Sequence, residues 1–191
     1  MPRAGLSSAR VTDAAAELAD EVGLDRVTLT ALAKSFGVAT PSLYSHVRSS
    51  DDVRIRVALL ALEETADRLA DALAGVSGRA ALAAMGGVWR SYATEHPGRY
   101  AATRLPLDAA TAAASAGPRH ADLGRAALRG YALPDVDETH AVRLLGATFH
   151  GYAALDAAGA FGHRADAPTS DETWERVLDG LDTLLRSWEK P

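Results

Sequence analysis

The sequence contains no cysteine among its 191 residues, and only 6 % of the residues are aromatic. Without cysteine there are no disulfides and no thiolate chemistry, which fits a reducing compartment such as the cytoplasm. No apolar run is long enough to cross a bilayer, and the first residues lack the apolar core of a signal peptide. We therefore expect a cytoplasmic protein without a membrane partner, and the chain is long enough to bury a core.

Signatures of catalysis and metal binding are also missing from the sequence. There is no G-x-S-x-G, no H-E-x-x-H and no glycine-rich phosphate loop. The six histidines are scattered and lack the spacing of metal ligands. We expect no enzymatic activity, no metal and no cofactor.

The composition and the apolar periodicity favour an all-α fold. Hydrophobic residues make up 48 % of the chain, many of them alanine, and no segment alternates as a strand does. We expect about nine helices: a three-helix head over residues 1–52, then a ligand-binding and dimerising bundle over residues 53–191. Residues 1–7 are expected to form a loose arm, and residues 159–168 a loop. The clearest predicted helices cover residues 8–22, 49–74, 80–95, 119–133, 137–158 and the segment that begins at residue 170.

Residues 28–50 have the pattern of two short helices joined by a tight turn. Gly37 follows the first apolar stripe directly, where a positive φ lets the chain turn. Thr40 suits an N-cap and Pro41 suits the first helical position, so we expect a second helix to begin there. The buried residues would be Leu29, Leu32, Ala33, Phe36, Leu43 and Val47. The side chains of Thr40, Ser42, Tyr44 and His46 would face outward, as in a helix-turn-helix that reads DNA.

The distribution of charge along the chain matters more than its net charge of −5. Residues 1–56 are neutral overall, and the rest of the chain carries the excess of acid. Residues 26–50 contain no Asp or Glu, so a duplex would meet basic side chains there without an opposing carboxylate: Arg26, Lys34, His46 and Arg48. This small number predicts few phosphate contacts and a shallow dependence of DNA binding on salt.

The segment DAAAELADEVGLDRVTLTALAKSFGVATPSLYSHVRSSDDV resembles the DNA-binding head of the TetR family of bacterial repressors. A weaker resemblance, to C-terminal domains of the WHG type, is carried by WRSYATEHP and FHGYAALDAAGAF. The resemblance implies a homodimer on a palindromic operator in double-stranded DNA. It also implies an unknown small-molecule effector bound in each C-terminal bundle, whose binding swings the long connecting helix. The chain is thus identified as a ligand-responsive regulator, and a repressor is favoured.

The predicted DNA contacts lie in and beside the second helix of the motif. Thr40 and Ser42 are placed to read base edges, and Pro41 to touch a thymine methyl group. In the family, the residues that match Tyr44 and His46 contact phosphates or bases, although Tyr44 could instead be partly core. The remaining candidates are expected at phosphates: Thr28, Thr30, Arg48 and Ser50. Thr28 can also serve as a plain N-cap, and Arg48 can be merely solvated.

One departure from the family pattern concerns the start of the long connecting helix. Family members often have a lysine where this chain has Ser50, and Asp51 and Asp52 follow. Ser49 and Asp52 are spaced as in a capping box. A cationic anchor is therefore missing or replaced by a weaker hydroxyl, and we expect lower affinity for DNA.

The effector pocket is predicted from the two segments that resemble the family's pocket. The candidates are Met85, Trp89, Tyr92, Tyr100, Phe149, His150 and Tyr152. Any one of them can be ordinary core. His150 is polar within an apolar helix, so it needs Asp156, a backbone carbonyl or a ligand as partner. Because charges are few, we expect a mostly apolar or aromatic ligand.

The last helix carries more apolar residues than one neighbouring helix needs to cover, which favours dimerisation. With Leu145 of the preceding helix, the predicted dimer residues are Trp174, Val177, Leu178, Leu181, Leu184, Leu185 and Trp188. The alternative is an inner helix of a monomeric bundle. Two other classes of protein also stay open: a helical enzyme or ligand carrier with a vestigial head, and a helical protein-interaction dimer.

Overall fold

The computed structural model describes residues 6–162 and 167–188, and within these ranges it contains helices and no strand. Residues 1–5 of the expected arm and 163–166 of the expected loop lie outside the described residues. The nine α-helices are α1 (Ser8–Val22), α2 (Leu29–Phe36), α3 (Ser50–Ala72), α4 (Gly78–Glu95), α5 (Pro97–Ala102), α6 (Ala109–Ala114), α7 (Gly117–Ala127), α8 (Asp135–Ala157) and α9 (Ser170–Ser187). Three 3-10 helices complete the described part: η1 (Leu24–Arg26), η2 (Thr40–Leu43) and η3 (Leu128–Gly130). The predicted all-α class is confirmed.

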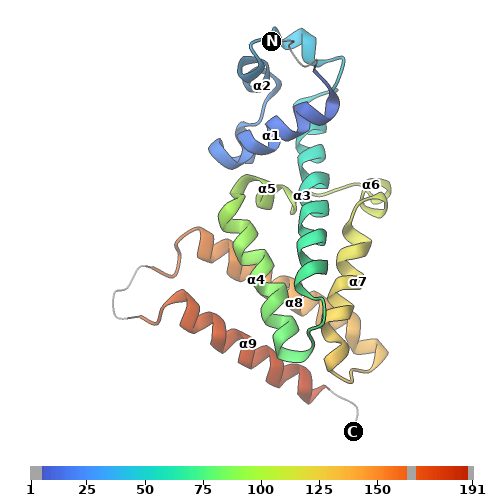
Figure 1. Cartoon of the computed structure of the whole chain (residues 1–191), viewed down its shortest axis with the longest axis vertical. Helices are drawn as coiled ribbons and strands as arrows, with labels where there is room; N and C mark the ends of the chain where they lie inside the picture. The colour runs from blue at the N-terminus through green and yellow to red at the C-terminus, as the bar shows by residue number, and fades with distance from the viewer. Residues whose placement is uncertain (1–5, 163–166, 189–191) are drawn as a thin grey trace. The chain divides into compact units, whose positions relative to one another are not determined.

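The chain forms two compact units. The head unit consists of residues 1–64 and 95–115, and the bundle unit of residues 65–94 and 116–191. The residues of α3 are divided between the two units. The helices α5 and α6 belong to the head unit, although in the sequence they follow α4, which belongs to the bundle unit (Figure 1). The predicted boundary between residues 52 and 53 divides the chain by function and stays a prediction.

The helix ends in the head unit follow local rules of capping. The Ser7 side chain accepts a hydrogen bond from the Arg10 amide and so caps α1. Gly23 ends this helix with φ +91°, and Gly37 ends α2 in the left-handed region with φ +64°. Other residues rarely adopt such φ values, so both glycines are required where the chain turns. The predicted bounds of α1 and the predicted turn at Gly37 are confirmed.

The core of the head unit is built by the apolar stripes of α1, α2 and the segment after α2. Val11, Leu32, Leu43 and Val47 are buried, and each contributes about 1.5–3 kcal/mol by leaving water. The helix α5 packs against α1 (Figure 1), and Ala102 of α5 joins the same core.

The second helix of the predicted motif differs from the expected α-helix. It is the single 3-10 turn η2, its N-cap is Ala39 rather than Thr40, and turns continue as far as His46. The Ser42 amide donates to the Ala39 carbonyl and the Tyr44 amide to the Pro41 carbonyl, both bonds spanning three residues. A segment this short gains few α-helical hydrogen bonds, so the tighter 3-10 form is favoured.

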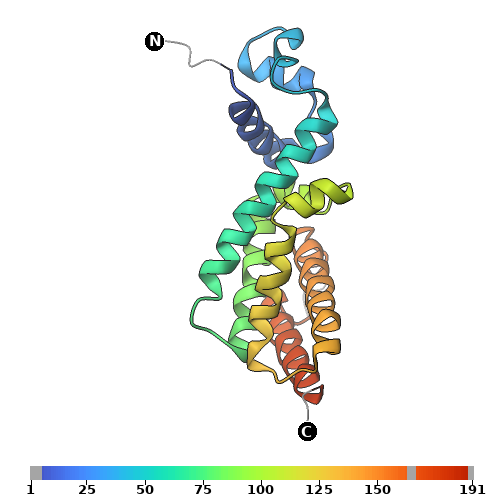
Figure 2. The same ribbon diagram turned by 90° about the vertical axis from the view of Figure 1, so that its right-hand side faces the viewer.

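The bundle unit contains α4, α7, α8 and α9, and α7 and α8 lie side by side (Figure 2). Its core joins α8 to α9, where the Trp174 ring lies 5.5 Å from the Phe149 ring and 4.8 Å from the Tyr152 ring. The helix α4 joins them because Gly86 has no side chain: a Cβ atom there would lie 2.4 Å from Trp174. None of the described helices combines the length and the apolar character that crossing a membrane requires.

Candidate nucleic-acid interface and effector site

Residues 40–48, called the reading segment below, present a polar face on a buried support. Leu43 and Val47 anchor this segment in the core of the head unit. Tyr44 is 60 % exposed, which excludes the alternative that this ring is partly core. The other exposed residues of the segment are Pro41, Ser42, Ser45 and Arg48, and Thr40 and His46 are half-buried. The segment therefore offers hydroxyl, phenol, imidazole and guanidinium groups side by side.

The start of α2 also belongs to the predicted DNA-binding motif, and two of its amides are capped by hydroxyl groups. Thr28 Oγ1 accepts from the Ala31 amide (3.1 Å), which confirms the predicted N-cap. Ser50 Oγ, from the first residue of α3, accepts from the Leu29 amide (3.2 Å). Ser50 thus fills a capping role that was not predicted, and its proton is left to donate elsewhere. Thr30 is exposed in the first turn of α2.

The carboxylates at the start of α3 are neutralised by arginines of the same helix. Asp51 pairs with Arg54 (3.1 Å) and Asp52 with Arg56 (3.2 Å). Burial disfavours the charged form of Asp52, but hydrogen bonds from the Arg48 amide and the Arg56 side chain outweigh it and lower the pKa of Asp52. The two acids therefore oppose DNA less than their sequence position suggests.

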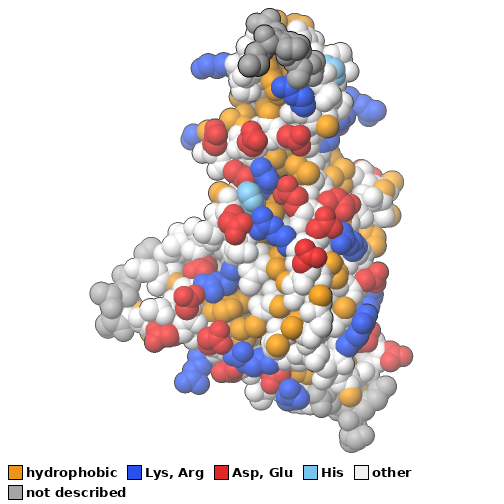
Figure 3. Space-filling model, viewed as in Figure 1, with side chains coloured by type: hydrophobic (Ala, Val, Ile, Leu, Met, Phe, Trp, Pro, Cys, Tyr) orange, Lys and Arg blue, Asp and Glu red, His pale blue; other side chains and the backbone are white. Residues whose placement is uncertain are grey.

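The capping box predicted from Ser49 and Asp52 is half present. Ser49 Oγ accepts from the Asp52 amide (3.1 Å), but the Asp52 carboxylate accepts from the Arg48 amide (2.9 Å) instead of returning to Ser49. On the face seen in Figure 3, Lys, Arg and His side chains appear among the described residues around α2 and η2, whereas Asp and Glu form a row over α1. This face of the head unit thus separates basic from acidic side chains.

Six of the seven predicted effector residues belong to the bundle unit, where four of them take part in contacts between rings. The Trp89 ring lies 4.3 Å from the His150 ring and 5.3 Å from the ring of His120. Phe149 and Tyr152 form a second group of ring contacts, with Trp174, and Met85 and Tyr92 are also buried in this unit. The helices α4 and α8 thus bring Trp89 and His150 into contact, whereas the role of these residues in effector binding stays a prediction.

Two members of this cluster were missed in the sequence. His120 of α7 stacks on Trp89, and its Nε2 atom lies 3.2 Å from Oγ1 of the buried Thr65. These residues lie far from the predicted segments in the sequence, and no local pattern marks them. They add polar groups to a site that was expected to be mostly apolar or aromatic.

Asp156, one predicted partner of His150, is held by other residues. Its carboxylate accepts from Arg90 of α4 (2.7 Å) and from the Ser170 hydroxyl at the start of α9 (2.5 Å). Burial disfavours its charge, but the bonds from Ser170 and Arg90 prevail and lower the pKa of Asp156. This ionic cluster fastens α4, α8 and α9 together.

Comparison with known proteins decides the family. Residues 11–56 match the model of bacterial regulatory proteins of the tetR family, and residues 82–181 match the tetracyclin repressor-like C-terminal domain. An uncharacterised HTH-type transcriptional regulator, YobS of Bacillus subtilis (strain 168), is 33 % identical over 98 % of this chain and 93 % of its own length. This chain belongs to the TetR family. It is a DNA-binding transcriptional regulator, which supports the prediction that it is not an enzyme.

Two solved structures show how far the fold extends. A protein of unknown function from Rhodococcus sp. RHA1 superposes with a TM-score of 0.75 at 26 % identity, covering 97 % of this chain and 99 % of that one. A TetR variant from Acinetobacter baumannii AYE, in complex with minocycline, gives 0.70 at 22 % identity over 98 % and 100 % of the two chains. Both comparisons confirm a TetR-like fold for nearly the whole chain, whereas the finer assignment to the WHG type stays a prediction.

The seventh predicted effector residue, Tyr100, belongs to the head unit of this TetR-family chain. Burial raises the pKa of the Tyr100 phenol, against the influence of Arg104, whose guanidinium lies 5.0 Å from the ring centroid. Its role in effector binding stays a prediction.

The predicted dimer residues need a correction. Five of them are buried within the chain itself: Leu145, Trp174, Leu178, Leu181 and Leu185. The prediction that these five form the dimer surface is therefore wrong, because α9 uses them against its own chain. Val177 and Trp188 are half-buried, and Leu184 is 39 % exposed, so these three remain accessible to a partner.

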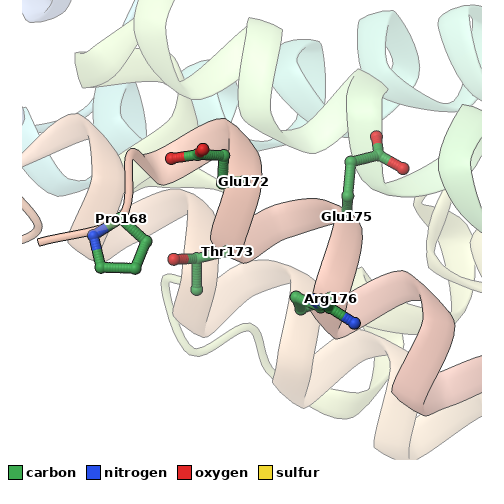
Figure 4. Close-up of a pocket in the computed structure, with 5 residues that line it drawn as sticks. All are labelled: Pro168, Glu172, Thr173, Glu175 and Arg176. Atoms are coloured by element: carbon green, nitrogen blue, oxygen red, sulfur yellow. The ribbon is translucent and has the colours of Figure 1, made fainter.

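A hollow of about 510 Å³ lies on the first half of α9 (Figure 4). Four of its five lining residues are polar or charged, and the lining consists of Pro168, Glu172, Thr173, Glu175 and Arg176. None of the seven predicted effector residues lines it. This hollow is therefore not formed by the aromatic side chains that were expected at the effector site.

Proposed function

We propose that this TetR-family regulator is a repressor that binds a palindromic operator as a homodimer through its reading segment. The observation that carries the proposal is the outer face of this segment, where Tyr44, Ser42 and Arg48 are exposed above the buried Leu43 and Val47. Hydroxyl groups and the proline ring suit base edges and thymine methyl groups, and the cationic group suits phosphates. The absence of any acid from residue 26 to residue 50 removes repulsion from a duplex.

The homodimer is proposed to form through the outer faces of α8 and α9. On each helix an exposed glycine precedes an exposed leucine by four residues, so the two share a face: Gly151 with Leu155, and Gly180 with Leu184. A Cβ atom added to either glycine would meet no atom within 4 Å, so room is left for another backbone. Leu155 is 50 % exposed and Leu184 39 %, and a partner would bury both.

The effector is proposed to be a small, mostly apolar or aromatic molecule that binds at the aromatic cluster of the bundle unit and releases the operator. The minocycline complex of the A. baumannii TetR variant supports a small-molecule site in this fold. The indole of Trp89 stacks on the His120 ring and meets the His150 ring at a tilt, and such ring surfaces favour a flat, conjugated ligand. The hydroxyl of Thr65 and the two histidines would select a ligand with a few hydrogen-bonding groups.

The proposal is tested by selecting bound DNA from a random pool and repeating the selection with a metabolite library present. We expect a palindromic consensus that is lost when an effector is added. A thermal-shift screen of the same library should find apolar or aromatic stabilisers. A screen that finds only polar or anionic stabilisers would exclude the proposed effector class, and a pool without consensus would exclude sequence-specific reading.

A further inference from the structure

The last residues of the reading segment, where it leads into α3, are held by two other helices. The Ser8 hydroxyl of α1 donates to the His46 carbonyl (2.9 Å). The Arg48 amide donates to Oδ2 of Asp52 in the first turn of α3 (2.9 Å). Both bonds act on the backbone of the reading segment, so its outer side chains remain available to DNA.

Asp52 is itself held in place. Its own amide donates to Ser49 Oγ (3.1 Å), and Arg56 approaches the same Oδ2 atom that accepts from the Arg48 amide (3.2 Å). The side chain is only 23 % exposed. A carboxylate fixed by a charged neighbour and by its own helix turn is a rigid acceptor for the amide of Arg48.

Asp51 provides a contrast within the same turn of the helix. Its side chain is 82 % exposed, and its ion pair with Arg54 stays within α3. Both acids carry the same charge at nearly the same place, but only Asp52 is bonded to the reading segment. Their substitution therefore separates the effect of charge from that of geometry.

We propose that Asp52 is a positioning residue for DNA binding, whose carboxylate strengthens operator binding although its charge repels phosphates. By holding the Arg48 amide, it fixes the direction of the chain just after Tyr44 and His46. A reading segment that is already ordered does not have to be ordered on binding, so less binding free energy is lost. This inference rests on the proposed role of the reading segment in operator recognition.

Electrostatics and positioning predict opposite signs for the removal of Asp52. If only charge mattered, removing an acid near the duplex would tighten binding to every DNA sequence. If Asp52 positions the reading segment, its removal weakens binding to the operator while binding to unrelated DNA stays the same or tightens. The ratio of specific to non-specific affinity is therefore the decisive quantity.

The experiment measures fluorescence anisotropy of a selected operator and of an unrelated duplex of equal length, with the full-length protein. We expect Asp52→Ala to weaken operator binding about tenfold or more without weakening the unrelated duplex. Asp51→Ala, the matched control, should leave both affinities unchanged or tighten both. Asp52→Asn should recover most of the affinity, because an amide oxygen still accepts from the Arg48 amide.

Ser8→Ala removes the second support without any change of charge and guards against a folding defect in the Asp52 variants. It should also weaken operator binding, by severalfold, with an unchanged circular dichroism spectrum. The proposal is overturned if Asp52→Ala tightens operator binding as Asp51→Ala does, or if Asp52→Asn loses as much affinity as Asp52→Ala. The variant Tyr44→Ala tells whether such a result contradicts the positioning role alone or also the proposed function. If Tyr44→Ala binds the operator normally, the proposed function is wrong. If Tyr44→Ala does not bind the operator, only the positioning role of Asp52 is wrong.

Discussion

Gly98 of α5 lies so close to Ala19 of α1 that a Cβ atom on Gly98 would be 2.0 Å from the carbonyl carbon and oxygen of Ala19. The next residue continues the contact, since the Arg99 amide donates to the Asp20 carboxylate (2.8 Å). This backbone contact explains why α5 belongs to the head unit although it follows α4 in the chain. It fastens the first helix of the DNA-binding motif to a segment that begins where α4 ends.

Replacement of Gly98 by alanine is predicted to destabilise the head unit by about 2 kcal/mol or more. The added methyl group would collide with backbone atoms of α1, which cannot move aside as the end of a flexible side chain can. The matched control is Gly87→Ala in α4, where a Cβ atom would meet no atom within 4 Å. That change should stabilise the protein by about 0.5–1 kcal/mol through helix propensity. Urea unfolding measures both, and equal stabilities of the two variants would refute the close contact.

The Asp156 cluster is predicted to make the bundle unit sensitive to acid. The pKa of Asp156 in the folded protein is lowered below its ordinary value of 3.8. The ionised carboxylate therefore stabilises the folded state fully above that value, and this stabilisation is lost as pH falls through the folded-state pKa. Asp156→Asn should therefore cost about 1–3 kcal/mol near pH 7 and progressively less in acid. Denaturant titrations of both proteins across this pH range provide the check. A difference that does not shrink in acid would show that the carboxylate charge is not involved.

Dimerisation through α8 and α9 is predicted to fail when a charge is placed on the proposed face. Leu184→Glu should weaken the dimer roughly a hundredfold, about 3 kcal/mol, since the interface would bury an unpaired carboxylate. Val76→Glu is the control: Val76 is 38 % exposed, close to the 39 % of Leu184, but lies outside the proposed face. Analytical ultracentrifugation should find monomers only for the first variant. A Leu184→Glu protein that dimerises like the native one would place the interface elsewhere.

The dependence of operator binding on salt is predicted to be shallow. Among residues 26–50 only Arg26, Lys34 and Arg48 carry a permanent positive charge, and the acids that follow are neutralised within α3. Six such contacts per dimer would give a slope of log K against log salt of about −5. Anisotropy titrations at several salt concentrations measure this slope. A value near −10, as for a strongly basic repressor, would mean that other cations contact the duplex.

The sequence predicted what local rules determine. Gly23 and Gly37, the cap at Thr28 and the buried pair Leu43 and Val47 follow from capping and periodicity, and the structure confirms them. The bond from the Leu29 amide to Ser50 was not predicted because it joins residues 21 positions apart. No periodicity can reveal a contact that only the folded turn creates.

The last helix shows a second limit of sequence reasoning. The apolar stripe of α9 was predicted correctly, but a stripe does not say whether its partner is the same chain or a second copy. Trp174 and Leu178 are buried against their own chain, so fewer apolar side chains of α9 are left for a second copy than the sequence suggested. Which face is left for a partner depends on Gly86, whose missing side chain lets α4 approach Trp174.

The central claim, that the reading segment recognises the operator, is tested most directly by one comparison of affinities. Operator binding of the native protein and of Tyr44→Ala is measured by anisotropy, with the oligomeric state and melting temperature of both recorded. Because Tyr44 is 60 % exposed, its truncation should leave folding and assembly intact. The account predicts a loss of operator affinity of at least about tenfold, the size of one lost anchoring contact. Unchanged affinity in a folded Tyr44→Ala protein would contradict it.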